Sequence, residues 1–145
     1  MKPKGIAFLI FAALLLAACA APGSGALAGT SWVLQSLDGS SQVGAALGGQ
    51  PVTLQFTSAS EMGGFGGCNS YGGSYRADSA SISFRDIVST LMACADENMT
   101  NLESAYFQAL SAADSYAITL CESCANDQTL TITGGGHTLV FVGLT

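Results

Sequence analysis

The chain alternates apolar and polar side chains with a period of two over most of its length. The pattern is clearest at 52–57, where Val52, Leu54 and Phe56 alternate with threonine and glutamine. Successive side chains of a strand point to opposite faces of a sheet, so this alternation predicts antiparallel strands with one buried face and one wet face. The same prediction applies to residues 31–37, 81–85, 116–120, 129–133 and 137–144.

Glycine and aspartate mark the turns between these strands. Asp38-Gly39 ends the first strand, and Gly134-Gly135-Gly136 separates the last two. Glycine permits the positive φ of a tight turn, so the final pair is predicted to be a hairpin. Residues 63–75 are dense in glycine, which predicts sharply bent strands or bulges in a curved sheet.

One segment has helical rather than strand periodicity. Leu102, Tyr106 and Leu110 recur every four residues with alanines between them, which predicts a helix over roughly 98–113. Thr100 and Glu103 have the spacing of a capping box. The small side chains on this face suggest that the helix lies across the sheet or closes one end of a barrel.

The N-terminus has the three parts of a bacterial export signal. Lys2 and Lys4 give a positive start, residues 6–16 form an apolar run, and Leu16-Ala17-Ala18-Cys19 closes it. A spanning helix needs about 20 apolar residues, so this run is too short to remain as one. Small residues before a cysteine resemble the lipobox of bacterial lipoproteins, which predicts a lipid on Cys19. An ordinary secretory signal cleaved nearby is the alternative.

These features predict three segments: a signal peptide at 1–18, a flexible tether at 19–28 and one folded domain at 29–145. The tether is rich in alanine, proline, glycine and serine, a composition typical of flexible linkers. The lipid on Cys19 is expected to attach the protein to a membrane of the cell envelope. In a Gram-negative host the outer membrane is favoured, facing the periplasm, because Ala20 is not the aspartate associated with inner-membrane retention.

The mature chain is expected to be acidic. Removing the segment before Cys19 takes away both lysines and changes the formal net charge from −6 to −8. Such a charge repels nucleic acid and anionic lipid headgroups, so we expect no nucleic-acid partner, whereas a basic protein partner remains compatible.

Four cysteines remain when Cys19 is assigned to the lipid: Cys68, Cys94, Cys121 and Cys124. In an exported domain an even number of cysteines favours disulfides, and four cysteines allow three pairings. Cys121 and Cys124 have the spacing of a redox motif, but they fall between two predicted strands, where a local bridge is favoured. A zinc site would need all four cysteines together, and we expect neither metal nor cofactor.

No catalytic group of residues emerges from the sequence. The only histidine, His137, follows a glycine turn and is interpreted as a solvent-facing hairpin residue. Asp86, Asp96 and Glu97 are expected on a solvated rim. An enzyme needs a nucleophile with a base within reach, and this pattern predicts none, so we do not expect an enzyme.

A resemblance adds to this interpretation. The segment Gly67-Cys68-Asn69-Ser70-Tyr71, with Tyr75 four residues on, and the later Ser89-Thr90-Leu91-Met92-Ala93-Cys94 resemble the META domain of HslJ-like proteins. Gly29-Thr30-Ser31-Trp32 resembles that family's start, and the similarity covers about 29–145. It implies a small antiparallel barrel-like sheet with one helix, an envelope lipoprotein and an association with stress tolerance, drug resistance or secretion. The residues Cys121 and Cys124 depart from the common pattern.

The function expected from this resemblance is a stress-related binding or structural module. Asn69, Tyr71 and Tyr75 are candidate binding residues, although for Asn69 a structural role, in which the side chain bonds to local backbone, is favoured. Because Cys68 and Cys94 lie in the family-like segments, we predict that they pair with each other, and that Cys121 pairs with Cys124. The alternative function is a periplasmic inhibitor of lysozyme or another small basic protein. The sequence leaves the oligomeric state open.

Overall fold

An antiparallel sheet of eight strands forms most of the domain. The computed structural model describes residues 24–120 and 128–144, and the strand order in the sheet is β5-β4-β3-β2-β1-β8-β7-β6. The strands are β1 (Ser31–Leu37), β2 (Thr53–Phe56), β3 (Glu61–Phe65), β4 (Ser70–Ala77), β5 (Ile82–Ser89), β6 (Ser115–Leu120), β7 (Gln128–Gly134) and β8 (His137–Leu144). The helical elements are α1 (Ser24–Leu27), η1 (Gly44–Leu47) and α2 (Glu97–Ser111). The predicted mainly β fold is confirmed.

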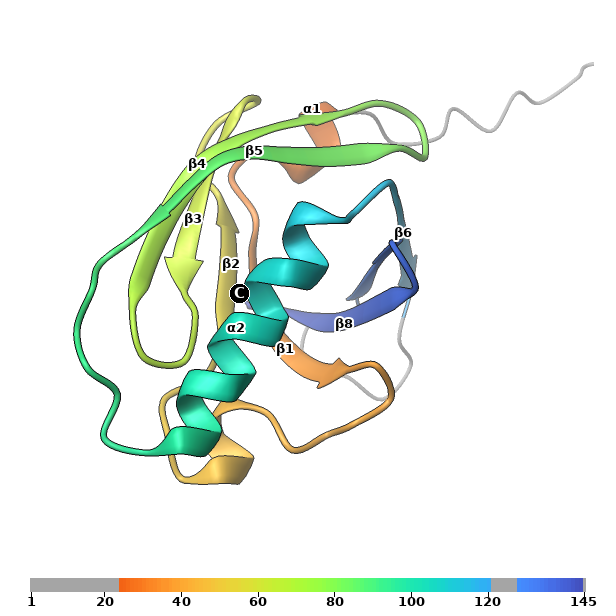
Figure 1. Cartoon of the computed structure of the whole chain (residues 1–145). Coiled ribbons are helices and arrows are strands. Elements are labelled where there is room, and N and C mark those ends of the chain that lie inside the picture. Colours follow the sequence, from red (N-terminus) through yellow and green to blue (C-terminus); the bar gives the residue numbers. More distant parts are fainter. Residues whose placement is uncertain (1–23, 121–127, 145) are drawn as a thin grey trace, which may run out of the picture.

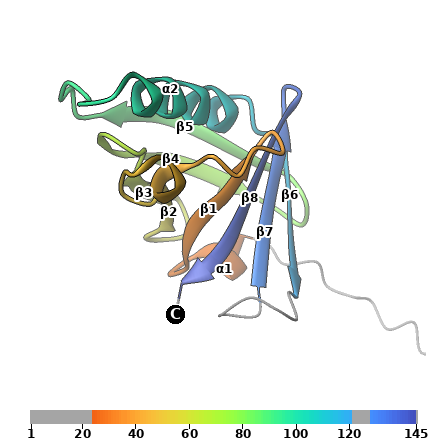
Figure 2. The same cartoon turned by 90° about the horizontal axis from the view of Figure 1, so that it is seen from below.

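The sheet curls into a half-barrel whose two edge strands meet only at one corner (Figures 1 and 2). At that corner the Tyr116 N–H donates to the carbonyl of Ala80 over 2.8 Å, and the Ile82 N–H donates to the carbonyl of Asp114 over 3.1 Å. Beyond this corner α2 lies across the open side of the sheet. Of the two arrangements predicted for the helix, across the sheet or closing one end of a barrel, the structure has the first.

The predicted turns have the backbone that their residues require. Asp38 and Gly39 have φ of 51° and 80°, and Gly135 and Gly136 have φ of 59° and 87°. Positive φ at both central residues is typical of tight hairpin turns, whose twist matches that of the strands. The first and last strands accordingly have the predicted bounds, 31–37 and 137–144.

The glycine-dense segment forms β3, β4 and the turn between them. A Cβ at Gly63 would lie 2.8 Å from the Tyr71 carbonyl oxygen, and one at Gly73 would lie 2.8 Å from the Arg85 carbonyl oxygen. Only glycine allows such close approach of neighbouring strands. The pairing of β4 with β5 also shifts register between Gly72 and Ser74, so the predicted bulge is confirmed.

The helix α2 begins and ends slightly earlier than predicted. Its N-cap is Asp96, whose carboxylate accepts the Asn98 N–H over 2.7 Å. The predicted capping box is therefore wrong, since Thr100 lies inside the helix and the Glu103 side chain bonds elsewhere. Tyr106 and Leu110 are fully buried, as the helical spacing predicted.

The core lies between α2 and the concave face of the sheet. Its largest fully buried side chains are Trp32, Phe56, Tyr75, Tyr106 and Phe141. Leu27 of α1 is also fully buried, and the Gly29 N–H donates to the Phe56 carbonyl over 2.7 Å. The packed part of the chain therefore begins before Gly29, the start expected from composition, because one leucine in an otherwise small-residue segment enters the core.

Among residues 24–120 and 128–144, no helix has both the length and the apolar character needed to cross a membrane. Cys19, Cys121 and Cys124 lie outside these residues.

Candidate functional site

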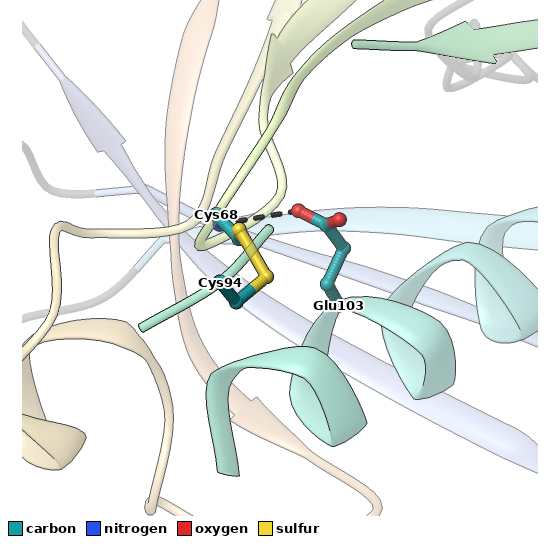
Figure 3. Close-up of side chains that lie close together, drawn as sticks. All are labelled: Cys68, Cys94 and Glu103. Carbon is teal, nitrogen blue, oxygen red and sulfur yellow. Dashed lines mark hydrogen bonds between the residues drawn. A yellow bond between two sulfur atoms is a disulfide. The ribbon is translucent and has the colours of Figure 1, made fainter. Parts of the chain in front are cut away.

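A buried carboxylate joins α2 to the turn between β3 and β4. Glu103 Oε2 accepts the Asn69 N–H over 2.6 Å. The same oxygen accepts the Cys68 N–H over 3.1 Å (Figure 3). Glu103 Oε1 accepts from Asn69 Nδ2 over 2.8 Å. Hydrogen bonds to an ionised group are stronger than neutral ones, and Glu103 is only 9% exposed. The helix therefore holds this turn through one side chain.

Asn69 carries the same network onward to the loop that follows β5. Its Nδ2 also donates to the Met92 carbonyl over 3.3 Å. Its Oδ1 accepts the Met92 N–H over 2.8 Å and the Thr90 hydroxyl over 2.9 Å. An asparagine amide offers two donor hydrogens and two acceptor lone pairs, and all four are used here. These contacts give Asn69 the structural role that the sequence favoured.

A disulfide closes the same region covalently. Cys68 and Cys94 are bonded, with their Cα atoms 5.6 Å apart, which confirms the predicted pairing. The two sulfurs and a Glu103 oxygen lie within 4.8 Å of one another. Thiolates would be ligands for a soft metal, but these sulfurs are bonded to each other and the carboxylate already accepts three N–H groups. We therefore assign a structural role to this cluster.

The two candidate tyrosines lie inside the domain. The Tyr71 hydroxyl lies 2.8 Å from the Thr53 carbonyl oxygen and 2.7 Å from the Tyr106 hydroxyl. The Tyr75 hydroxyl donates to the Ser58 carbonyl over 2.9 Å. Burial raises the pKa of Tyr71 and that of Tyr106 well above the usual tyrosine range. Both candidates therefore direct their polar atoms to internal partners.

The loop between β5 and α2 presents apolar side chains that the sequence did not single out. Leu91 is 96% exposed and Met92 is 64% exposed, although Asn69 and the disulfide fix the backbone on both sides. The sequence signal was an apolar Leu-Met-Ala run without the period of two that marks a strand, directly before Cys94. Leu91 and Met92 are adjacent in the sequence, whereas the other large exposed apolar residues of the described chain, Val88, Leu120 and Leu144, are separate in the sequence.

A cleft of about 380 Å³ opens beside this loop. We call it the disulfide cleft, because it is lined by Cys68 and Cys94 together with Leu47, Phe65, Met92 and Met99. Asp96, the N-cap of α2, also lines it. The cleft thus joins an apolar wall, an exposed methionine and an acidic side chain in one surface.

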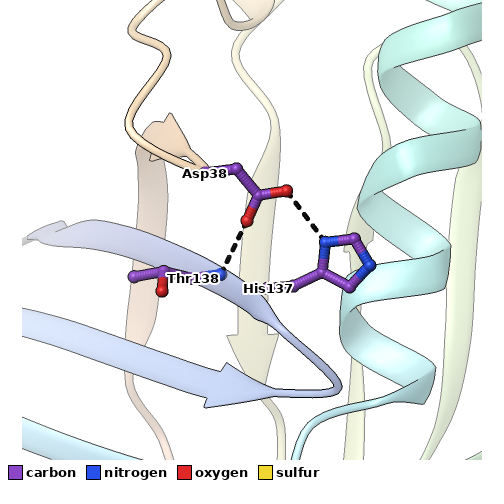
Figure 4. A network of polar contacts seen from close by, with 3 residues as sticks. All are labelled: Asp38, His137 and Thr138. Carbon is purple, nitrogen blue, oxygen red and sulfur yellow. Dashed lines mark hydrogen bonds and ion pairs between the residues drawn. The ribbon is translucent and has the colours of Figure 1, made fainter.

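His137 has a partner that its hairpin position did not reveal. Its Nδ1 lies 2.8 Å from Asp38 Oδ2, and Asp38 Oδ1 accepts the Thr138 N–H over 2.7 Å (Figure 4). The bond to His137, followed by that to Thr138, lowers the pKa of Asp38 below its usual value. The His137 side chain is 32% exposed, so it is only partly the solvent-facing residue that was expected.

This pair borders a second groove, along one face of α2. The groove is lined by Ser104, Gln108, Ser111 and His137, among others. An aspartate that orients an imidazole is a feature of hydrolytic triads. In the part of the chain that the structure describes, however, neither serine hydrogen-bonds to the imidazole. We interpret Asp38 and His137 as a structural pair, which connects the end of β1 to the β7–β8 hairpin.

A family model for the META domain matches residues 25–145. The chain belongs to the META domain family. The match begins within α1, in agreement with the burial of Leu27. It also confirms the family suggested by the motifs around Cys68 and Cys94.

Two solved structures resemble this META domain. The structure of a protein from Burkholderia xenovorans, determined by NMR, is 27% identical with a TM-score of 0.69, and the match covers 100% of this chain and 98% of that chain. A second NMR structure is 20% identical with a TM-score of 0.58, covering 81% of this chain and 92% of that chain. The second likeness concerns the fold alone. No curated protein matches the chain significantly.

Proposed function

We propose that this META domain protein is a lipid-anchored, non-enzymatic module of the cell envelope that works by binding another protein, with a role in stress tolerance. The observation that carries the binding role is the loop with Leu91 and Met92. These side chains are exposed, yet their backbone is held by Asn69 and by the disulfide. An ordered apolar loop on an acidic surface is the kind of feature that marks a protein interaction site.

The envelope location rests on the sequence around Cys19. The apolar run and the Leu16-Ala17-Ala18-Cys19 segment support export and lipidation. Mass spectrometry of the mature N-terminus tests this directly. A diacylated Cys19 as the first residue is the expected result. An unmodified cysteine, or an N-terminus elsewhere, would contradict the anchor.

The absence of catalysis is proposed because the polar groups of the family-like motif have internal partners. The Asn69 amide uses all its hydrogen-bonding capacity within the domain. The His137 imidazole is held by Asp38, and no serine among residues 24–120 and 128–144 bonds to it. The test is a broad screen with hydrolase substrates. We expect no turnover; turnover that His137→Ala abolishes would overturn the proposal.

The binding role is tested by photo-crosslinking in cells that make the full chain. A photoreactive amino acid replaces Leu91 in one strain and Leu120 in a control strain, because Leu120 is also an exposed leucine, at 81%. We expect a protein adduct from position 91 that disappears when Met92→Asp is added. The same adduct in equal yield from positions 91 and 120 would contradict a binding surface specific to the Leu91-Met92 loop.

The role in stress tolerance rests on the family and needs a separate test. Cells lacking the protein are complemented with the wild-type chain or with Leu91→Ser/Met92→Ser, and growth under envelope stress is compared. We expect the wild type to restore growth and the variant to restore it poorly. Full rescue by the variant would separate the stress role from this loop.

A second candidate is an inhibitor of lysozyme or another small basic enzyme. The observation that favours it is the net charge of −8 expected after the lysines are removed with the signal segment. Opposite charges steer association and strengthen it at low salt. Inhibition of lysozyme that weakens as salt is added would support this candidate. Unchanged lysozyme activity in an excess of the purified protein would exclude that enzyme as the target.

A further inference from the structure

We infer that the disulfide cleft and the adjoining Leu91-Met92 loop dock a segment of a protein partner that has an apolar anchor flanked by basic residues. This inference rests on the proposed binding function and specifies the chemistry of the partner. Three features of the surface carry it: its apolar side chains, its fixed backbone and its acidic rim.

The apolar part of the surface is large enough for an anchor side chain. Leu47, Phe65 and Met99 line the cleft together with Met92, which is largely exposed. Leu91 extends beyond it into solvent. Removing apolar surface from water favours association, so covering Leu91 and Met92 while filling the cleft favours binding of an apolar side chain.

The backbone of the loop is already in place before any partner arrives. Met92 bonds to the Asn69 amide through both its N–H and its carbonyl. Cys94 is bonded to Cys68, and Cys68 is held by Glu103. Ordering a loop on binding costs free energy, and a loop ordered in advance avoids this cost. The exposed apolar side chains are therefore presented by a fixed support.

The acidic side chains beside the cleft favour a partner with basic side chains. Asp96 lines the cleft, and Glu97 follows it in the first turn of α2. Both side chains are exposed. Beyond the N-terminal lysines the chain has only two basic residues that are permanently charged, Arg76 and Arg85. Arg76 lines a different hollow, at the corner where the edge strands meet. Lysine or arginine beside the partner's anchor would find complementary charge.

A lipid surface fits these observations less well than a protein. Anionic headgroups would be repelled by Asp96 and Glu97. The loop between β5 and α2 also lies at the opposite end of the domain from α1, as Figures 1 and 2 show. A second copy of the chain would bring two acidic rims together. A basic protein segment is the occupant that satisfies both the apolar and the acidic parts.

The test uses the mature full-length protein in nanodiscs of zwitterionic lipid. The probe is a short fluorescent peptide of leucine and lysine, and the matched peptide has glutamate in place of lysine. We expect saturable binding of the lysine peptide and much weaker binding of the glutamate peptide. Leu91→Ser/Met92→Ser should raise the Kd about tenfold or more, whereas the control Leu120→Ser should leave it unchanged.

The acidic rim is tested separately with Asp96→Asn/Glu97→Gln. Asparagine is as good an N-cap as aspartate, so α2 keeps its cap while both charges are lost. We expect the Kd to rise about two- to fivefold at low salt and the difference to shrink at high salt. Circular dichroism and melting curves verify that each variant folds.

The outcomes separate the two proposals. If the glutamate peptide binds as tightly as the lysine peptide and Leu91→Ser/Met92→Ser weakens both, the basic partner is wrong and the binding surface stands. If Leu120→Ser weakens binding as much as the loop variant does, or if the lysine peptide does not bind, the inference is overturned. The photo-crosslinking experiment tests the binding function independently of any peptide.

Discussion

At the scale of single residues, Glu103 and Asn69 connect α2, the β3–β4 turn and the loop between β5 and α2. The carboxylate of Glu103 accepts three N–H groups from Cys68 and Asn69, and the Asn69 amide then fixes Met92. Both side chains are buried. Buried polar groups must find partners inside the protein, because leaving them unpaired costs free energy. These two residues satisfy each other and thereby order the exposed loop.

Replacing Glu103 with glutamine should destabilise the domain. The glutamine NH2 group would face N–H donors that now bond to a carboxylate oxygen, so at least one buried donor would lose its acceptor. The expected loss is about 1–3 kcal/mol in the free energy of unfolding, measured by urea denaturation with the disulfide intact. The control Glu97→Gln, on the exposed side of the same helix, should cost less than about 1 kcal/mol. Equal losses for the two variants would contradict the role of Glu103.

The buried tyrosine pair predicts a loss of stability at alkaline pH. Burial raises the pKa of Tyr71 and Tyr106 above the ordinary value of 10.0. Because the folded-state pKa lies above the unfolded-state pKa, stability is fully present below about pH 10 and is lost as the pH rises above it. The Tyr71→Phe variant should show a shallower decline, since one such tyrosine is removed.

The measurement for this pair is the urea midpoint at a series of pH values from about 8 to about 11. Tyr71→Phe should also lose about 1 kcal/mol at neutral pH, because the Thr53 carbonyl and the Tyr106 hydroxyl lose a partner. An alkaline decline as steep as that of the wild type would contradict the assignment of the effect to this pair.

Residue roles were the part of the structure that the sequence predicted least well. Glu103 was assigned to a capping box because its spacing from Thr100 fits one, but its partners lie 34 and 35 residues away. Asp38 lies 99 residues from His137. Periodicity describes neighbours along the chain, and such distant pairs are set only by the folded sheet. The role favoured for Asn69, bonds to local backbone, is structural as observed, but its side chain bonds to Thr90, Met92 and Glu103, which lie 21, 23 and 34 residues away.

At the scale of elements, the disulfide joins the β3–β4 turn to the loop before α2. Cys68 and Cys94 are 26 residues apart in the sequence, and closing a loop of this size is expected to stabilise the folded state by about 3–4 kcal/mol. The double variant Cys68→Ser/Cys94→Ser should therefore lower the melting temperature markedly. The variant should also make the Leu91-Met92 loop more mobile, because only the hydrogen bonds to Asn69 would then hold its backbone.

The comparison for this prediction is Cys121→Ser/Cys124→Ser. A bridge between cysteines so close in sequence closes a short loop and is expected to contribute only about 2 kcal/mol. Thermal melts of the two double variants and non-reducing peptide maps are the measurements. A larger loss from the second variant, or a peptide linking Cys94 to Cys121 or Cys124, would refute the predicted pairings.

The elements themselves were largely predictable, because local patterns determine them. The period of two located most of the strands, and the glycine turns set the bounds of β1 and β8. The segment 24–28 was different, since its composition is that of a linker, yet Leu27 is buried. One apolar side chain in a short segment leaves no periodic signal. The start of the packed domain therefore could not be located from composition.

At the scale of the whole molecule, the start of the described chain and the proposed binding surface lie at opposite ends of the domain. The chain enters through α1 at one end of the curled sheet, and the loop with Leu91 and Met92 lies at the other (Figure 1). Because Cys19 precedes α1 in the sequence, the proposed lipid would attach the domain through the end that carries α1. This arrangement suits a tethered protein that presents one fixed surface to a partner in the surrounding compartment.

The most direct test of this account is the oxidation of Met92 in intact cells compared with the purified protein. Met92 is 64% exposed, whereas Met62, which does not line the cleft, is 3% exposed and serves as the internal control. Exposed methionines are oxidised to the sulfoxide faster than buried ones, and mass spectrometry follows each residue separately. If a partner covers the loop, Met92 should be oxidised rapidly in the purified protein and several-fold more slowly in cells, with Met62 slow in both. Equal oxidation of Met92 in the two settings would contradict the account.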